Sequence, residues 1–497
     1  MAVETTADSA PRGTAGAEPW PAPREAWYAV FVFSLVLMMN FLDRGIITLL
    51  FPYLKRDLGL SDVQLGLVTG VAFAVFYTFF GLPIARWADV GVRRTIIGIG
   101  VATWSLMTAL CGLATNFWQL FLFRVGVGAG EACNGPATFS MMADYFPKEK
   151  LPRAIAVLNF GFMAGTGMAL IIGGVVIGVL DAMPPANVPF LGELRSWQLA
   201  FIIAGVPGLF IAMLLWTVRE PPRRGRIAKG APAGSRPASI PIRDVVRFVV
   251  ENRSTYVPMF LALAFNVVLA FGTAAWVPAF YGRTFGWSMS DVGLIAGLVI
   301  LVVWPFGAMC GSWMAERLQA GGWPYAERCG KRLAEWSRGK GWSAGARLGT
   351  WLERRARWER RDDANLLVLL WSIILHVPGL IAFPLMPTAW LAVAVSAVNG
   401  FVAAWVLGPQ NAAIQVVTPN EMRAQVTALF LFIFNILGTG LGPLITAAFT
   451  QYVFGAEDML KYSLVAVAAT LGPLAAFSTW WGLKAYAKSV ARARAWG

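Results

Sequence analysis

Long apolar runs separated by short polar segments constrain this chain more than any other feature. Each run reaches the roughly 20 residues that a helix needs to cross the hydrocarbon of a bilayer. They lie near residues 27–54, 64–86, 94–114, 118–145, 153–180, 198–218, 254–281, 289–315, 364–386, 388–417, 424–450 and 460–487. With 57% hydrophobic and 14% charged residues, a soluble fold could not hide this surface from water. The sequence therefore predicts an all-α membrane protein with twelve transmembrane helices.

The distribution of basic residues predicts the orientation of these helices. Of the 41 Lys and Arg residues, 34 lie in segments on the side of the N-terminus, 5 lie on the opposite side, and Arg44 and Arg124 lie within spans. By the positive-inside rule, both termini are expected in the cytoplasm. Topology and contact with anionic lipid account for the net charge of +14, so no nucleic-acid partner is expected.

The two halves of the chain resemble each other. Ser61-Asp62-Val63 before the second run matches Ser290-Asp291-Val292 before the eighth, and Gly135-Pro136 in the fourth matches Gly408-Pro409 in the tenth. Duplicated bundles place a site at their interface. The expected organisation is a cytoplasmic tail at 1–26, a six-helix bundle at 27–220, a cytoplasmic linker at 221–253, a second six-helix bundle at 254–487 and a tail at 488–497.

A basic insert at 318–361 interrupts the second bundle and is rich in Arg, Trp and Gly. One interpretation is an amphipathic helix that lies on the anionic leaflet. Its anchors would then be Trp336, Trp342, Trp351 and Trp358. The alternative is a solvated basic loop.

Four ionisable residues lie well inside apolar runs: Asp43 and Arg44 in the first, Arg124 and Glu131 in the fourth. At mid-membrane such groups together cost on the order of 10 kcal/mol unless they pair or face water. Arg124 and Glu131 are two helical turns apart, so they share a face, and Gly128 between them leaves room for a partner or ligand. A structural salt bridge is one explanation. A path for ions or substrate is the other, and it is the hypothesis favoured here.

The charges of this cluster suggest a proton switch. With all four groups ionised the cluster is neutral, and protonation of Asp43 or Glu131 leaves it with one positive charge. A positive site attracts an anionic group. We therefore predict that Glu131, more than Asp43, is the proton-coupling residue, and that Arg44 and Arg124 hold an anionic headgroup.

The second half carries almost no charge inside its runs. A cavity with one charged wall and one apolar, aromatic wall suits an amphipathic anion better than a sugar. His376 is expected to be a packing residue. The further candidates for substrate binding are Asn40, Asn266, Trp276, Asn411 and Asn435.

Several classes of chemistry lack their motifs in this sequence. No nucleophile triad, zinc-ligand spacing or nucleotide fingerprint is found, so no enzyme activity, metal or cofactor is expected. The four cysteines form no disulfide framework.

The segment 85–94, after the second run, resembles the major facilitator signature. It keeps the charged positions Asp89, Arg93 and Arg94, whereas Ala85 replaces the usual glycine and Val90 an arginine. The resemblance implies two pseudo-symmetric six-helix bundles and a cytoplasmic gate in this loop. The gate residues would be Asp89, Arg93, Arg94, Asp144, Arg153 and Arg423.

Within that superfamily the chain looks like the Spinster subfamily. The similarity rests on Asn40-Phe-Leu-Asp-Arg44, on 124–132 with Pro136, on 197–201 and on 205–208 leading to 219–222. It covers the first half well and the second half weakly. It implies an alternating-access, proton-coupled carrier of lysophospholipids or sphingosine-1-phosphate-like lipids. A bacterial inner membrane and a monomeric state are expected as well.

Other functions stay open at this point. Within transport they are a proton-linked carrier of small organic or sugar acids and a drug/proton antiporter. Outside coupled transport they are a lipid scramblase and a membrane receptor. The buried charges favour coupled transport.

Overall fold

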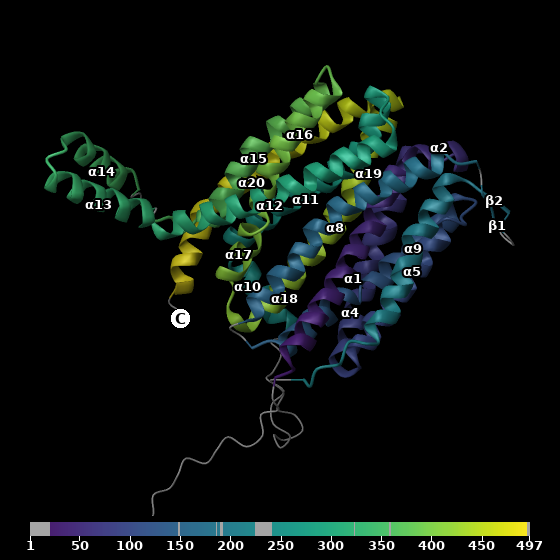
Figure 1. Cartoon of the computed structure of the whole chain (residues 1–497), viewed down its shortest axis with the longest axis horizontal. Helices are drawn as coiled ribbons and strands as arrows, with labels where there is room; N and C mark the ends of the chain where they lie inside the picture. Colours follow the sequence, from purple (N-terminus) through teal and green to yellow (C-terminus); the bar gives the residue numbers. More distant parts are fainter. Residues whose placement is uncertain are drawn as a thin grey trace, which may run out of the picture.

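The computed structural model describes residues 20–147, 150–184, 186–188, 192–223, 241–322, 324–356 and 359–494. Within this part of the chain, eleven helices are long and apolar enough to cross a membrane. They pack into the bundle shown in Figure 1. The predicted all-α membrane fold is confirmed.

The first half contains α1 (Pro23–Leu49) and α2 (Phe51–Leu58), followed by a helix that runs through α3 (Asp62–Gly66), the π-helical segment η1 (Leu67–Val71) and α4 (Ala72–Val90). Then come α5 (Arg93–Cys111), α6 (Phe117–Glu131), α7 (Asn134–Tyr145), α8 (Leu151–Asp181), a short antiparallel pair β1 (Ala186–Val188) and β2 (Gly192–Leu194), and α9 (Ser196–Leu215).

The second half begins with α10 (Ile242–Glu251), which lies in the predicted linker, and continues with α11 (Arg253–Phe285), α12 (Met289–Ala320), α13 (Pro324–Gly339), α14 (Ser343–Ala356) and α15 (Ala364–Ala382). After η2 (Phe383–Leu385) come α16 (Ala389–Ala403), η3 (Ala404–Val406), α17 (Pro409–Val416), α18 (Asn420–Ile433), η4 (Phe434–Leu441), α19 (Gly442–Ala448), η5 (Phe449–Phe454), η6 (Glu457–Met459) and α20 (Leu460–Ala493). The last helix thus continues past the predicted boundary at 487.

The predicted fourth span is not among the eleven long apolar helices, and it is present as two shorter helices. It consists of α6 and α7, with a turn at Ala132 and Cys133 between them. Pro136 has no N–H to donate to the carbonyl of Ala132, so the regular ladder cannot pass through this turn. Glu131 is therefore the last residue of α6.

The tenth span, Ala389–Val416, is one of the eleven but is also interrupted. The 3₁₀ segment η3 separates α16 from α17 just before Pro409, which cannot donate to the carbonyl of Trp405. The two Gly-Pro pairs of the internal repeat thus impose the same interruption on the fourth and tenth spans.

The polar contacts that join the two bundles gather at one end, called here the closed end. There Arg283 of α11 binds Asp62 of α3, Lys55 of α2 binds Glu457, and the backbone N–H of Val63 donates to Gln451. The opposite end, where α1 begins and α20 ends, is called the open end (Figure 1).

Glycines allow the bundles to approach closely near the closed end. A Cβ on Gly174 of α8 would lie 2.8 Å from the carbonyl oxygen of Ser290 on α12, and one on Gly167 would lie 2.8 Å from that of Gly297. In the other seam, a Cβ on Gly70 of η1 would lie 2.9 Å from the carbonyl oxygen of Thr439 in η4. Backbone therefore packs on backbone in both seams, as small residues permit in membrane bundles.

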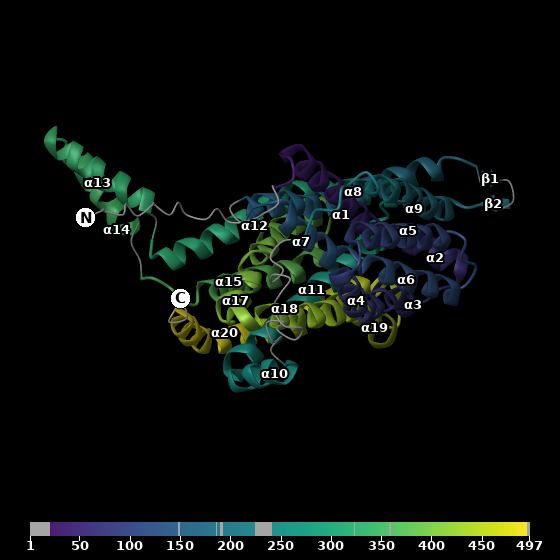
Figure 2. The same cartoon turned by 90° about the horizontal axis from the view of Figure 1, so that it is seen from below.

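The insert forms two helices, α13 and α14, rather than a loop. They pack against each other and stand away from the spans as an arm, at the far left of Figure 1 and again in Figure 2. Trp358 lies outside the described residues, as do most of the linker at 224–240 and the tails at 1–19 and 495–497.

Candidate functional site

Two helices bring the four predicted charges together. Asp43 and Arg44 lie on α1, and Arg124 and Glu131 lie on α6. The Arg44 guanidinium donates from Nε to Oε2 of Glu131 at 2.8 Å, and its Nη2 lies 2.7 Å from the same oxygen. The sequence had not assigned Arg44 to Glu131, since it grouped Arg124 with Glu131 on one face of a helix.

Arg44 is the member of this cluster that reaches an accessible surface. Its side chain is 21% exposed, whereas that of Glu131 is 0% exposed. Asp43 and Arg124 are buried as well. An ion or substrate that approaches the cluster therefore meets Arg44 before any of the other three groups.

Aromatic rings from α1 and α4 hold the Arg44 guanidinium. Its carbon lies 4.2 Å from the ring centroid of Phe73, 5.3 Å from that of Phe41 and 5.5 Å from that of Tyr77. Such cation–π contacts stabilise a cation where little water reaches it. Phe73 and Tyr77 were not predicted, because an aromatic residue in an apolar run carries no signal that distinguishes packing from a site.

The space beside Gly128 is occupied by the protein itself. A Cβ at this position would lie 2.6 Å from the carbonyl oxygen of Phe73. The glycine thus admits the backbone of α4 against α6, and it is this approach that brings Phe73 over Arg44. The expected room for a partner is filled by α4.

The polar network around the charges is incomplete. Arg124 Nη1 donates to the backbone carbonyl of Asp43 at 3.4 Å. Among the described residues, the buried atoms Asp43 Oδ1, Glu131 Oε1 and Arg124 Nε have no hydrogen-bond partner. A buried charged group that lacks hydrogen bonds costs free energy, and in structural salt bridges the buried oxygens and nitrogens normally have hydrogen-bond partners.

Two neutral polar residues lie next to the cluster. Asn40 is buried beside Glu131, and Thr108 of α5 is buried beside Asp43. The sequence predicted Asn40 but missed Thr108, since a lone threonine is common in membrane helices.

The candidates in the second half are used differently. Trp276 is fully buried, and its indole N–H donates to the carbonyl of Pro443 at 2.9 Å. The amides of Asn411 and Asn435 donate to carbonyls one turn earlier on their own helices, at 3.1 Å and 2.9 Å, and Asn266 is half-buried. Asn435 lies in the π-helical segment η4, a kind of distortion often found at functional sites. None of the four contacts the charged cluster through a hydrogen bond in the described chain.

His376 pairs with Asn399 rather than with a charge. Its Nδ1 lies 2.8 Å from Asn399 Oδ1, and both side chains are buried. Gly379 leaves space for this amide, since a Cβ there would lie 2.5 Å from Asn399 Oδ1. The pairing agrees with the predicted packing role.

The six predicted gate residues do not form one group. Arg93 is buried and binds Asp144 at 2.5 Å and Glu220 at 2.8 Å, while Arg94 donates to the carbonyl of Val218 at 3.0 Å. These contacts join α5, α7 and the end of α9 within the first bundle. Arg153 is exposed with its guanidinium 5.7 Å from the ring of Trp27, Arg423 lies in the second bundle, and the side chain of Asp89 is outside the described part. Their gating role stays a prediction.

Comparison with known sequences decides the family. The profile of the Major Facilitator Superfamily matches residues 33–326. The chain belongs to the Major Facilitator Superfamily.

One relative is an MFS-type efflux pump of Mycolicibacterium smegmatis, 26% identical over 450 residues that cover 90% of each chain. A probable L-galactonate transporter of Escherichia coli is 27% identical and covers 55% of this chain and 58% of its own. Protein spinster homolog 1 of Xenopus laevis is 26% identical and covers 40% of this chain and 36% of its own.

Among solved structures, a bacterial homologue of the human lysosomal transporter Spinster is similar in two inward-facing forms. The unoccupied form has a TM-score of 0.66 at 24% identity and covers 95% of this chain and 98% of its own. The occupied form has a TM-score of 0.65 at 25% identity and covers 96% and 98%. The predicted major facilitator fold and the resemblance to Spinster proteins are both confirmed.

Proposed function

We propose that this transporter is a proton-coupled secondary carrier that moves an amphipathic anion by alternating access. The observation that carries the proposal is the ion pair between partly exposed Arg44 and fully buried Glu131. A carboxylate in this position has two ways to be neutralised, by Arg44 or by a proton. Arg44 is paired when Glu131 is ionised and unpaired when Glu131 is protonated. Proton binding therefore controls whether Arg44 is free to bind an anion.

Coupling follows from this competition. While Glu131 is ionised, it occupies the Arg44 guanidinium and the cluster is neutral. When Glu131 takes up a proton, Arg44 loses its partner and becomes an anion site with net positive charge. Arg124, whose Nε has no partner among the described residues, supplies further donors. Release of the anion restores the original pair when Glu131 gives up its proton.

The surroundings of Arg44 favour an anion with an apolar part. Its guanidinium is enclosed by the rings of Phe41, Phe73 and Tyr77. The second-half candidates that are not fully buried, Asn266, Asn411 and Asn435, carry no charge. A lysophospholipid or a sphingosine-1-phosphate-like lipid has one charged headgroup and one chain, and it matches both walls.

The arrangement of the bundles supports alternating access. The ion pairs Arg283–Asp62 and Lys55–Glu457 hold the bundles together at the closed end. If the basic segments face the cytoplasm, as their distribution predicts, the site of this conformation opens toward the cytoplasm of a bacterial inner membrane. The protein would work as a monomer.

A carrier of small sugar acids is the second candidate, because the L-galactonate and hexuronate transporters are relatives. Arginine suits a sugar carboxylate as well as a phosphate. The full-length similarity to an efflux pump keeps drug/proton antiport as a further alternative.

Reconstituted protein tests these substrates directly. Uptake of a lysophospholipid, of glucuronate and of a cationic drug is measured in proteoliposomes with and without a pH gradient. We expect saturable, gradient-dependent movement of the lysophospholipid, and loss of this movement in Arg124→Ala. Movement of glucuronate alone would transfer the proposal to sugar acids. Lipid movement that neither saturates nor responds to pH would identify a scramblase, and binding without movement a receptor.

A further inference from the structure

The arm formed by α13 and α14 is built as a compact unit of its own. A Cβ on Gly349 of α14 would lie 2.4 Å from the backbone nitrogen of Ala334 on α13, so the two helices touch through their backbones. Ala334 and Ser337 are buried in this contact. The large side chains are therefore left on the outside of the hairpin.

The outer surface of the arm combines exposed indoles with cations. Trp336, Trp342 and Trp351 are 58%, 50% and 50% exposed, and Leu348 is exposed as well. Residues 324–356 contain eight Lys and Arg residues against three Glu residues. Exposed tryptophans beside basic residues are typical of segments that lie in the interface of an anionic membrane.

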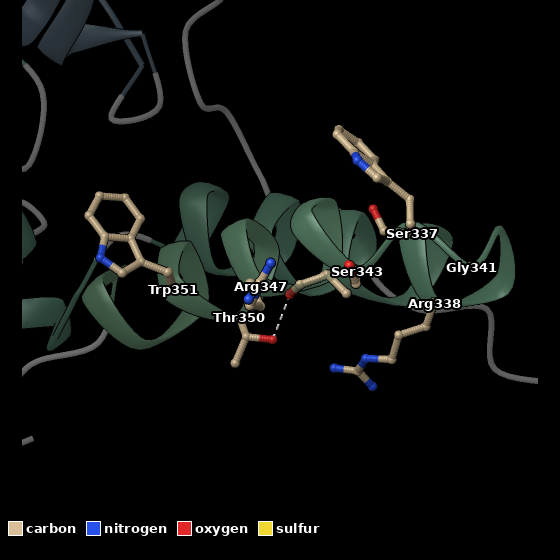
Figure 3. Close-up of a pocket in the computed structure, with 9 residues that line it drawn as sticks. Ser337, Arg338, Gly341, Ser343, Arg347, Thr350 and Trp351 are labelled. Carbon is tan, nitrogen blue, oxygen red and sulfur yellow. Dashed lines mark hydrogen bonds between the residues drawn. The ribbon is translucent and has the colours of Figure 1, made fainter.

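A hollow of about 690 Å³ lies on this surface, and Figure 3 shows the residues around it. Arg338, Arg347, Ser337 and Thr350 contribute polar groups, and Trp342 and Trp351 contribute apolar walls. The Ser337 side chain is fully buried, and its hydroxyl has no hydrogen-bond partner among the described residues. Thr350 donates its hydroxyl to the carbonyl of Ala346, so the two guanidinium groups of the lining are the donors left for a phosphate group.

The position of the arm places this hollow at the membrane boundary. Only residues 321–323 separate α13 from α12, and α15 begins at Ala364, shortly after α14 ends. Both α12 and α15 are candidate spans. A helix of 16 residues extends about 24 Å, too short to cross the hydrocarbon itself, so the arm can lie on the surface but not span it.

We propose that the α13–α14 arm docks on the bilayer by binding the phosphate headgroup of an anionic phospholipid in this hollow. Arg338 and Arg347 bind the phosphate, and Trp342 and Trp351 enter the headgroup region beside it. Because the arm connects α12 to α15, its docking fixes the end of the second bundle relative to the membrane surface. The partner is the bilayer rather than a soluble protein, since the indoles and cations together match an anionic interface.

Docking can be measured on the full-length protein. Cys329 is exposed on α13 and accepts an environment-sensitive fluorophore once Cys310→Ser has removed the other partly accessible thiol. The protein is placed in nanodiscs of phosphatidylcholine, with or without phosphatidylglycerol. The readout is quenching by a lipid that carries a nitroxide near its headgroup.

With phosphatidylglycerol present, we expect strong quenching that decreases between low and high salt. The triple variant Arg338→Gln/Lys340→Gln/Arg347→Gln should lower the quenched fraction at least about fivefold, because each basic residue near an anionic surface contributes to its attraction. The double variant Trp342→Ala/Trp351→Ala should lower it as well. Both variants leave the small-residue contact between the helices unchanged.

A matched control removes the same charge elsewhere. Arg253, Lys484 and Lys488 are exposed near the open end, and their replacement by Gln should leave the quenching unchanged. Equal quenching in neutral and anionic nanodiscs would overturn the proposal. So would a response of the fluorophore to inorganic phosphate in neutral nanodiscs, or to a soluble protein fraction but not to phosphatidylglycerol.

Discussion

Asp62 at the start of the second span accepts two hydrogen bonds from Arg283 at the end of α11, each 2.8 Å long. Lys55 binds the same carboxylate at 2.6 Å. The Asp62 side chain is buried, although it belongs to a Ser-Asp-Val motif whose copy, Asp291, is exposed. One copy of the repeat thus became a connection between the bundles, while the other remained an ordinary helix start.

Asp62→Asn should weaken the closed end. Removal of the buried Asp62 charge leaves Arg283 and Lys55 with the exposed Glu457 as their remaining acidic partner in the described chain, and we expect a shift of about 2 kcal/mol toward conformations in which this end opens. Distance measurements between spin labels across the closed end would report the shift. Asp291→Asn is the matched control and should leave the distances unchanged; equal distances in both variants would contradict the assigned role.

Glu131→Gln should abolish the dependence of transport on pH. The amide cannot be ionised, so Arg44 is permanently released and substrate binding no longer depends on a proton. Binding of the anion should be retained, while movement driven by a pH gradient should be lost. Uptake from pH 5.5 to 8 measures this, with the exposed Glu193→Gln as control; an unchanged pH profile in Glu131→Gln would show that another group is the switch.

Gly128→Ala should disturb the site without removing any of its charges. The added methyl group meets the backbone of Phe73, which cannot yield as a flexible side chain would, and overpacking of this kind costs about 1–3 kcal/mol. Both thermal stability and transport should decrease. Gly81 lies on the same helix as Phe73 with nothing within 4 Å of a Cβ, so Gly81→Ala should be neutral or slightly stabilising. Equal effects of the two changes would argue against the packing described.

Asp57 provides a prediction about acid stability. Burial opposes its ionisation, but hydrogen bonds from Arg56, Arg195 and Trp197 outweigh that effect and lower its pKa to about 2. Because the folded-state pKa lies below the unfolded value of about 3.9, its stabilising effect is complete above that pH and is lost as the pH falls toward 2.

Asp57→Asn should therefore lower the melting temperature at pH 7 and pH 5 by the same amount, about 1–2 °C. The difference from the wild type should narrow below pH 4. Asp458→Asn, at an exposed position, should show no such pattern. A difference that grows on acidification would reverse the expected sign and exclude this account.

The sequence alone determined that the helices lie in lipid, how many spans there are, and which ionisable residues lie inside them. Apolar runs of sufficient length specify membrane helices wherever they occur in a chain, and Asp43, Arg44, Arg124 and Glu131 are conspicuous because hydrocarbon penalises ionised groups. The short motifs around the second span and in the first half indicated the family, because such motifs are recognised without knowing which residues are in contact.

Only the tertiary structure decided which charges are partners. Helical periodicity relates residues on one helix, so it grouped Arg124 with Glu131, whereas the approach of α1 to α6 pairs Glu131 with Arg44. Phe73 over Arg44 and Arg283 on Asp62 also join different helices, and no local pattern encodes them. Pairing across helices depends on how closely the helix backbones approach each other. Glycines such as Gly128 permit that approach, and their role is visible only when the neighbouring helix is in place.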